Sequence, residues 1–206
     1  MFELLPKEDA EYKRLTRRAA REFNRLQKEG GSDEGLKNIL MKRAAVSATA
    51  TMRIPVAAAI VDKNKGKRAL VFHERVDAAN KLLEILIKRK HSATVYHTKV
   101  GPVIRRDNLR LYRRGMFDVL VSCRALDEGT NVPETVVAVI ASSTSSQRQR
   151  IQRLGRVLRP SGGKTIASVY TLYATDIEER RLKEEEAALD GVAAVTWYKG
   201  KANSSG

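Results

Sequence analysis

Short apolar runs alternate with amphipathic stretches through most of the chain after residue 67, and this alternation constrains the fold more than any other feature. Runs of about four to eight apolar residues are typical of buried strands, and apolar residues at three- and four-residue spacing are typical of helices. Strands that alternate with helices indicate right-handed βαβ units, and so a parallel sheet with helices on both faces. We therefore predict an α/β fold. The expected strands are residues 68–73, 93–97, 117–122, 136–141, 165–172 and 193–198, and the expected helices are 76–90, 103–114, 147–159 and 177–189.

The first 65 residues carry helical spacing and no strand pattern. One helix is expected from Met1 to about Lys28, and a second from Leu36 to about Ile60, interrupted near Pro55. The small polar residues just before that proline leave their conformation open. Because this region lacks the strands to close a core of its own, we expect a helical lead-in rather than a second domain. The predicted division is therefore a lead-in at 1–65, a sheet domain at 66–198 and a flexible tail at 199–206.

The chain of 206 residues is strongly basic, with 39 lysines and arginines, 24 acidic residues and a net charge of +15. Such an excess favours a polyanionic partner such as nucleic acid, although it also serves solubility alone. A single cysteine, Cys123, excludes an internal disulfide and a cysteine cluster for zinc, which is typical of a reducing compartment. No run approaches the roughly 20 apolar residues of a membrane span. We expect an intracellular protein, in the cytoplasm or nucleoid.

Residues 147–159, QRQRIQRLGRVLR, predict an amphipathic helix with a concentrated basic face. Its apolar residues recur at three- and four-residue steps, so they can anchor one face in a core. Arg153, Arg156 and Arg159 recur every three residues and share a neighbouring face. Guanidinium groups held side by side suit phosphate oxygens, because the planar fork bonds them in pairs and stays charged. The alternative interpretation is a solvated basic helix with a buried apolar stripe.

The order of residues in this segment adds to the charge pattern. QRLGRVLR, at residues 152–159, resembles motif VI of the superfamily 2 helicases, Q-R-x-G-R-x-x-R, and matches each of its defined positions. In that family the last two arginines reach the γ-phosphate of ATP that is bound by a preceding domain. The resemblance implies this catalytic role for Arg156 and Arg159, and contact with ATP for Gln152 and Arg153.

A second segment carries the same resemblance. SCRALDEGTNVPE, at residues 122–134, resembles motif V of the superfamily, which ends in Leu-x-E-G-x-D-x-P. The resemblance implies that Gly129 and Asn131 contact ATP. Asn131 stands where an aspartate is usual, so it keeps an oxygen that can accept a hydrogen bond from a ribose hydroxyl but loses the charge. Asparagine and proline also simply make turns, which is the alternative interpretation of this loop.

A third match lies before the expected third strand. Arg105, Leu109, Tyr112 and Gly115 follow the R-x-x-x-L-x-x-F-x-x-G spacing of these helicases, with tyrosine in place of phenylalanine. Together the matches cover about residues 68–172. The run RLGRVLRPSGGKT and the acidic helix that follows are most similar to the XPB-type branch, which comprises DNA repair and transcription helicases. The resemblance implies the second RecA-like domain of a superfamily 2 DNA helicase, with a RecA-like parallel sheet.

Polar residues stand where the expected strands finish. Ligands of open parallel sheets bind at the carboxyl edge of the strands, so these residues are expected to gather with the arginine helix at one edge. By the resemblance, they would hold the phosphates of a nucleic-acid strand, mostly without reading its sequence. The candidate nucleic-acid-binding residues are His73, Arg75, His97, Thr98, Ser122 and Arg124.

The resemblance implies an ATP-dependent motor in which this chain is one half. ATP and Mg²⁺ would be held by an N-terminal RecA-like domain, and no metal ligands are expected in this chain. GGKT at 162–165 is not a phosphate-binding loop, because Leu158 stands where that motif needs a glycine. We therefore expect the isolated chain to hydrolyse no ATP and the partners to be DNA and that domain, with no membrane. Two alternatives remain: a non-enzymatic nucleic-acid-binding module, and a translocase that moves on DNA without unwinding it.

Overall fold

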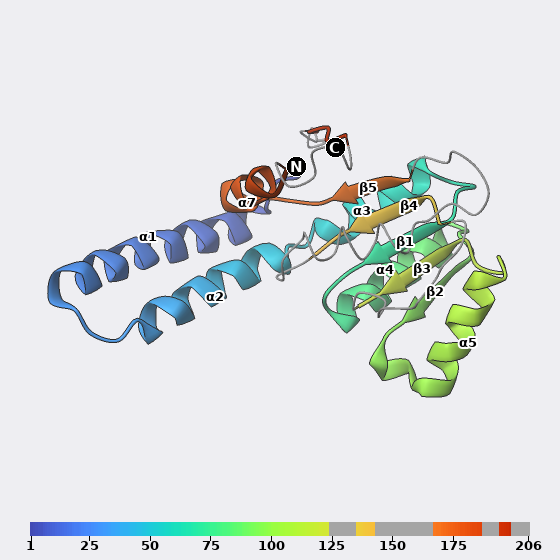
Figure 1. Cartoon of the computed structure of the whole chain (residues 1–206), viewed down its shortest axis with the longest axis horizontal. Helices are drawn as coiled ribbons and strands as arrows, with labels where there is room; N and C mark the ends of the chain where they lie inside the picture. The colour runs from blue at the N-terminus through green and yellow to red at the C-terminus, as the bar shows by residue number, and fades with distance from the viewer. Residues whose placement is uncertain (124–134, 143–166, 187–193, 199–206) are drawn as a thin grey trace.

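The computed structural model describes residues 1–123, 135–142, 167–186 and 194–198 (Figure 1). Within them, parallel strands form one sheet in the order β2-β3-β1-β4-β5. This arrangement confirms the predicted α/β fold with a parallel sheet, and each strand lies inside a range expected from its apolar run. The bounds are Ala69–Phe72 for β1, Ala93–Tyr96 for β2, Val119–Ser122 for β3, Val137–Ile140 for β4 and Ser168–Thr171 for β5.

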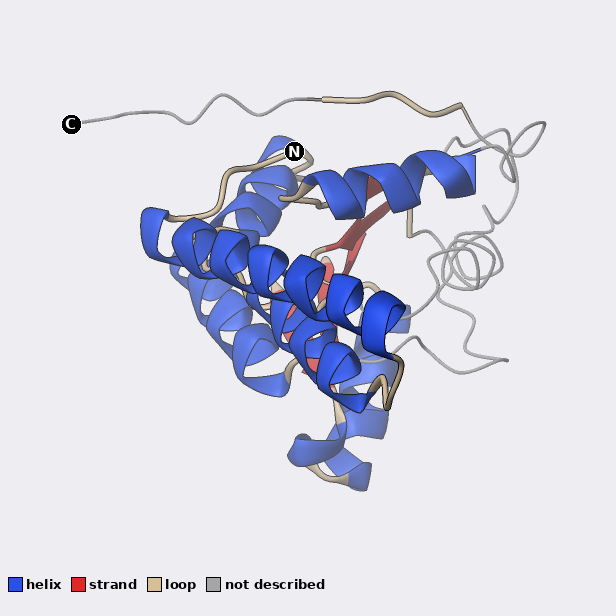
Figure 2. Ribbon diagram, turned by 90° about the vertical axis from the view of Figure 1, so that its left-hand side faces the viewer, coloured by secondary structure: helices blue, strands red, loops and turns tan. Residues whose placement is uncertain are grey.

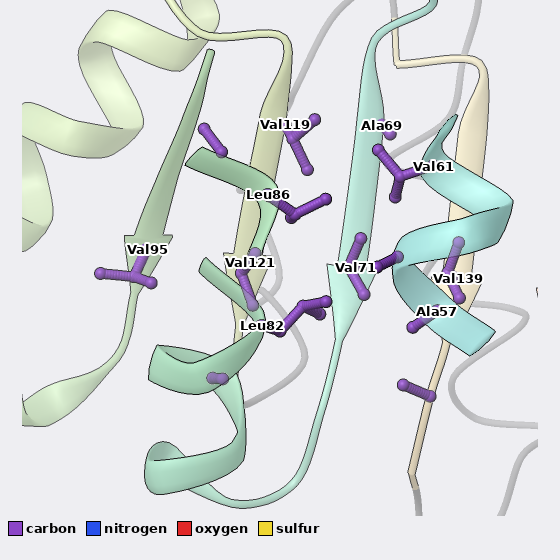
Figure 3. Packing of buried hydrophobic residues seen from close by; sticks show 14 of the residues in the cluster. Ala57, Val61, Ala69, Val71, Leu82, Leu86, Val95, Val119, Val121 and Val139 are labelled. Atoms are coloured by element: carbon purple, nitrogen blue, oxygen red, sulfur yellow. The ribbon is translucent and has the colours of Figure 1, made fainter. Parts of the chain in front are cut away.

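Helices cover both faces of the sheet because successive strand residues point to opposite sides. On one face Val71, Val121 and Val139 pack against α3 (Arg53–Lys63) and α4 (Val76–Lys88), as Figure 3 shows. On the other face Leu70, Leu120 and Ile140 pack against α5 (Pro102–Arg113). The central strands are buried on both sides, which explains why they are continuous apolar runs without alternation.

The N-terminal region forms a helical hairpin that projects from the sheet domain (Figure 1). α1 (Pro6–Glu29) and α2 (Glu34–Ala48) pack through Leu15, Ala19 and Ile39. The helix expected from Met1 begins at Pro6 instead. Proline suits the first helical turn, and the backbone N–H of Leu5 donates to the Glu8 carboxylate at 3.0 Å.

A turn at residues 49–52 separates α2 from α3, just before Pro55, where the sequence predicted an interruption. α3 belongs to the core of the sheet domain: Ala57, Ala58 and Val61 are buried against the strands. The predicted domain boundary at residue 65 stays a prediction, although the packing of α3 ties the end of the lead-in to the sheet.

Over the described residues, Glu34–Lys63 is the stretch long and apolar enough to cross a membrane by length and composition alone, with a mean hydropathy of 1.5. This differs from the expectation that no run approaches a membrane span. The structure supplies another reason for the apolar composition, because the stretch is two helices broken by a turn. Its second half buries Ala57, Ala58 and Val61 against the sheet and buries the charged Arg53.

The expected sixth strand is wrong over the residues that are described. Residues 194–198 form no strand. The N-terminal ammonium group of Met1 donates to the Tyr198 carbonyl at 2.6 Å, and the other contacts come from side chains. The Trp197 ring meets Tyr173 edge to face at 5.6 Å between centroids, and its Nε1 donates to Glu186 Oε2 at 3.0 Å. Glu186 is the last residue of α7 (Asp176–Glu186), so these contacts tie the segment to that helix.

Candidate functional site

The carboxyl ends of the strands meet at one edge of the sheet, as the sequence predicted. Phe72 lies beside Ser122 and Ile140, and Tyr96 also lies beside Ser122. The backbone N–H of His73 donates to the Ser122 carbonyl at 2.9 Å, and that of Ala141 donates to the Phe72 carbonyl at 2.8 Å. The residues that follow β1, β2, β3 and β4 therefore lie in one row, which we call the carboxyl edge.

His73 is a buried member of the carboxyl edge and is 2% exposed. Its Nδ1 accepts a hydrogen bond from the backbone N–H of Arg75 at 3.1 Å, so the neutral ring carries its proton on Nε2. Burial, followed by the nearby positive charge of Arg53, lowers the pKa of His73 to about 4. His73 is therefore neutral at physiological pH and holds the turn that leads from β1 into α4.

The pKa of His73 makes stability depend on pH. The unfolded chain protonates this histidine near 6.5 and the folded chain near 4, so folding is disfavoured progressively as pH falls through that window. We expect wild type to lose up to about 3 kcal/mol of unfolding free energy from this group between pH 7 and pH 4. His73→Asn, which keeps an acceptor but does not titrate, should show a smaller loss. Urea unfolding at several pH values measures the difference, and equal losses in both proteins would contradict it.

His97, which follows β2, is also buried, at 4% exposed. Its Nε2 lies 2.9 Å from Asn80 Oδ1 on α4, so Nε2 is the donor and Nδ1 the acceptor. That Nδ1 has no hydrogen-bond partner among the described residues. Burial, together with the charge of Lys99, lowers the pKa of His97. The ring therefore offers one buried acceptor on the side of the carboxyl edge where β2 ends.

The remaining predicted residues of the carboxyl edge divide by exposure. Ser122 is fully buried, whereas Arg75 and Thr98 are exposed. Arg75 pairs with Asp77 at 3.0 Å, and that carboxylate raises the pKa of the guanidinium. Thr98 begins the short helix η1 (Thr98–Val100). Arg75 and Thr98 are thus the described candidates that present side chains to solvent, and nucleic-acid contact by any of the set stays a prediction.

Arg53 is a residue of this region that sequence reasoning missed. It is 1% exposed and lies beneath the ends of β4 and β5. Its Nη1 donates to the carbonyls of Ala141 at 2.7 Å and Leu172 at 3.1 Å. Its Nη2 donates to Glu178 Oε1 on α7 at 2.5 Å. Nε donates to the Ser47 carbonyl at 2.7 Å. One guanidinium therefore joins α2, α3, α7 and both strands.

The charge of Arg53 is retained in spite of its burial. Burial lowers the pKa of the guanidinium, while the Glu178 carboxylate opposes that change. Because a guanidinium is a very strong base, the side chain stays protonated. The signal in the sequence was faint: a lone arginine among the apolar and small residues 44–61. Nothing in its spacing separates it from a surface arginine.

Tyr112 anchors the opposite end of the sheet. Its ring is fully buried in the core, and its hydroxyl lies 3.1 Å from the Ala69 carbonyl and 2.7 Å from Thr135 Oγ1. Burial raises the pKa of Tyr112 to about 12. Gly115, three residues later, has φ +76°, a conformation that side chains disfavour. The spacing that resembles a helicase segment therefore has a structural basis here in a buried ring and a helix end.

The predicted ATP-contacting segments leave from the carboxyl edge but lie outside the described residues. The chain runs from Ser122 and Cys123 into residues 124–134, and from Ser142 into residues 143–166. The predictions that lie there are Arg124, Gly129, Asn131, Gln152, Arg153, Arg156 and Arg159. Within the described ranges, no group of three or more His, Cys, Asp or Glu residues could hold a metal ion.

Comparison with known protein families gives a match over half of the chain. The profile described as "Helicase conserved C-terminal domain" matches residues 52–161. The matched span begins at the end of the turn before α3 and runs through the described strands β1 to β4. It includes residues 124–134 and residues 143–161, most of the second segment that leaves the carboxyl edge.

Curated relatives are longer proteins. The chain is 30% identical over 152 residues to the putative DNA 3'-5' helicase Rad25 of Haloarcula marismortui, which covers 73% of this chain and 24% of that protein. It is 25% identical over 141 residues to the DNA 3'-5' translocase XPB2 of Sulfurisphaera tokodaii, covering 67% and 31%. It is 35% identical over 109 residues to the UvrABC system protein B of Thermosipho africanus, covering 50% and 16%. The chain thus spans less than a third of each of these relatives.

Solved structures share the fold at low sequence identity. The C-terminal domain of the DEAD-box protein Dbp5 superimposes with a TM-score of 0.57 and 17% identity, covering 68% of this chain and 80% of that one. Domain 2 of the DEAD-box helicase Mss116p gives 0.55 and 22%, covering 66% and 55%. The sheet and its flanking helices therefore have the RecA-like arrangement of these domains.

Proposed function

Because the chain belongs to the helicase conserved C-terminal domain family, we propose that it is the second motor domain of an ATP-dependent superfamily 2 DNA helicase or translocase. One observation carries the proposal. The two segments with helicase-like sequence both depart from the carboxyl edge, at Ser122 and Ser142, where open parallel sheets bind their ligands. Two of the relatives are named as a DNA helicase and a DNA translocase, which supports DNA as the track.

In this proposal the chain contributes to ATP hydrolysis without binding ATP alone. Arg156 and Arg159 reach the γ-phosphate of ATP on an N-terminal RecA-like domain and stabilise the charge that develops there. Gln152, Arg153, Gly129 and Asn131 contact the rest of the nucleotide. Mg²⁺ would be held by the N-terminal domain, where it would offset negative charge on the phosphates.

The same proposal assigns the carboxyl edge to the nucleic-acid backbone. Arg75 and Thr98 are exposed there and contact phosphates directly. His73, His97 and Ser122 are buried, and the His73 N–H donates to the Ser122 carbonyl, so they hold the backbone of the edge in place and position the exposed residues that contact phosphate. Arg124 joins them from the segment after β3. The two domains close when ATP binds and open after hydrolysis, and this cycle moves the phosphate contacts along a strand.

The isolated chain is expected to bind single-stranded DNA weakly and to hydrolyse no ATP. Binding should weaken with a log–log salt slope of about −0.7 per phosphate contacted, because each contact releases a counterion. Fluorescence anisotropy with a labelled oligonucleotide between 50 and 300 mM salt measures the slope, and Arg75→Gln should make it shallower by about one contact. Lys63→Gln, on the exposed end of α3, is the control with the same charge change. A flat salt response, or ATP turnover by the chain alone, would contradict the proposal.

A further inference from the structure

The hairpin of α1 and α2 lies outside the sheet domain that the proposed function uses. Its two helices pack on each other through Leu15, Ala19 and Ile39, and the pair extends away from the sheet (Figure 1). Figure 2 looks at the hairpin from its tip, where α1 and α2 lie side by side in front of the domain. On the side of α1 that faces away from α2, the side chains are exposed to solvent.

Basic and acidic side chains of α1 lie on different sides of the helix. At 3.6 residues per turn, one arc of about 100° on the side away from α2 carries seven basic residues and no carboxylate. All of them are exposed. The helix carboxylates lie outside that arc, on the flanks and toward α2. The basic residues are Lys7, Arg14, Arg17, Arg18, Arg21, Arg25 and Lys28, which we call the α1 basic row.

Pairing with carboxylates compensates only part of the α1 basic row. Glu11 pairs with Arg14 at 2.7 Å, and Glu22 pairs with Arg25 at 2.6 Å. Within the described part of the chain, no carboxylate lies within ion-pair distance of Arg17, Arg21 or Lys28. Acids at three- and four-residue steps therefore pair with only Arg14 and Arg25 among the seven bases. The other members of the row keep a net positive charge on this side of the helix.

The geometry of this surface suits a straight polyanion. Lys7 and Lys28 are 21 residues apart, which at 1.5 Å per residue places them about 32 Å apart along the axis. That length corresponds to roughly nine base pairs at 3.4 Å each. The basic row carries no aromatic side chain on which single-stranded bases would stack, whereas a rigid duplex needs only aligned cations. We infer that the α1 basic row is a binding surface for the backbone of duplex DNA, separate from the carboxyl edge.

This inference rests on the proposed function, because it takes DNA as the track of the motor. The hairpin then holds the duplex while the carboxyl edge contacts the strand that is being moved. Contact with phosphates alone carries no sequence information, so the surface binds any duplex.

The test compares two double variants of the full chain. Arg21→Gln/Lys28→Gln removes two charges seven residues apart from the α1 basic row. Lys81→Gln/Lys88→Gln removes two exposed charges seven residues apart from α4. Glutamine is a good helix former, and circular dichroism checks that both variants keep their helices. Binding of a mixed-sequence 20-base-pair duplex and of single-stranded DNA is measured by anisotropy between 50 and 300 mM salt.

The α1 variant is expected to bind the duplex about tenfold or more weakly at 0.1 M salt, with a slope shallower by about 1.8, while the α4 variant matches wild type. Unchanged duplex binding by the α1 variant, or equal loss in both variants, overturns the inference but leaves the motor proposal standing if single-strand binding persists. The inference is also overturned if the α1 variant loses as much affinity for single-stranded DNA as for the duplex. Binding to phosphatidylserine vesicles is measured as well. An α1 variant that loses vesicle binding but keeps duplex binding overturns the inference too. A wild-type chain that binds neither form of DNA overturns both proposals.

Discussion

Replacing Arg156 with alanine is expected to reduce ATP turnover roughly 10³- to 10⁵-fold in a motor that joins this chain to an N-terminal RecA-like domain. The guanidinium would act only on the charge that builds up as the γ-phosphoryl group transfers, so its loss should lower kcat far more than it raises KM. Arg159→Ala should behave alike. Arg156→Lys should recover little, because an ammonium group keeps the charge but not the planar fork.

The control lies in the same segment. Arg148→Ala removes one guanidinium four residues before Gln152, outside the motif, and should leave turnover close to wild type. Steady-state ATP hydrolysis with saturating single-stranded DNA measures kcat and KM, and anisotropy measures DNA affinity. DNA affinity that falls in parallel with turnover would make these arginines DNA ligands instead and would contradict their proposed role.

Replacing Arg53 with methionine is expected to lower the unfolding free energy by about 3–5 kcal/mol. The substitution leaves the Glu178 carboxylate without its partner and strips hydrogen bonds from the Ala141, Leu172 and Ser47 carbonyls. Those carbonyls lie where β4 and β5 end, so the carboxyl edge should loosen together with α7. The unfolding free energy of Arg53→Lys should lie between those of wild type and Arg53→Met, because an ammonium keeps the charge but cannot span the same acceptors.

A double-mutant cycle separates the ion pair from the other bonds of Arg53. If the ion pair supplies most of the stabilisation, Arg53→Met/Glu178→Gln should lose clearly less unfolding free energy than the sum of the losses of Arg53→Met and Glu178→Gln. Arg14→Met, which breaks an exposed ion pair on α1, should change stability little. Urea unfolding followed by circular dichroism measures all four variants. A loss for Arg53→Met no larger than that for Arg14→Met would show that the buried network contributes nothing to stability.

The strands were predictable because their signal is local. ALVF, ATVY, VLVS and VAVI are short and mostly apolar, and such runs require burial on both faces of the sheet. Their carboxyl ends, and so His73, His97 and Ser122, followed from the strand bounds. The strand order β2-β3-β1-β4-β5 did not follow from any run, because pairing depends on contacts between distant segments.

The part of the site that escaped prediction is non-local. Arg53 bonds residues 88, 119 and 125 positions away, and no spacing in the sequence encodes such partners. The burial of His73 and His97 was equally hidden, since a polar residue just after a strand is usually exposed. Residues 194–198 were wrongly predicted to form a strand because they are rich in β-branched and aromatic types. Trp197 instead contacts the side chains of Tyr173 and Glu186.

The most direct test of the motor proposal is ATP hydrolysis after mixing this chain with its separately expressed N-terminal RecA-like domain, with and without single-stranded DNA. We predict DNA-stimulated turnover that appears only in the mixture and disappears when the chain carries Arg156→Ala. Sedimentation of the mixture shows whether the two domains associate. A mixture that associates and binds DNA but hydrolyses no ATP would contradict the motor proposal and favour a nucleic-acid-binding module.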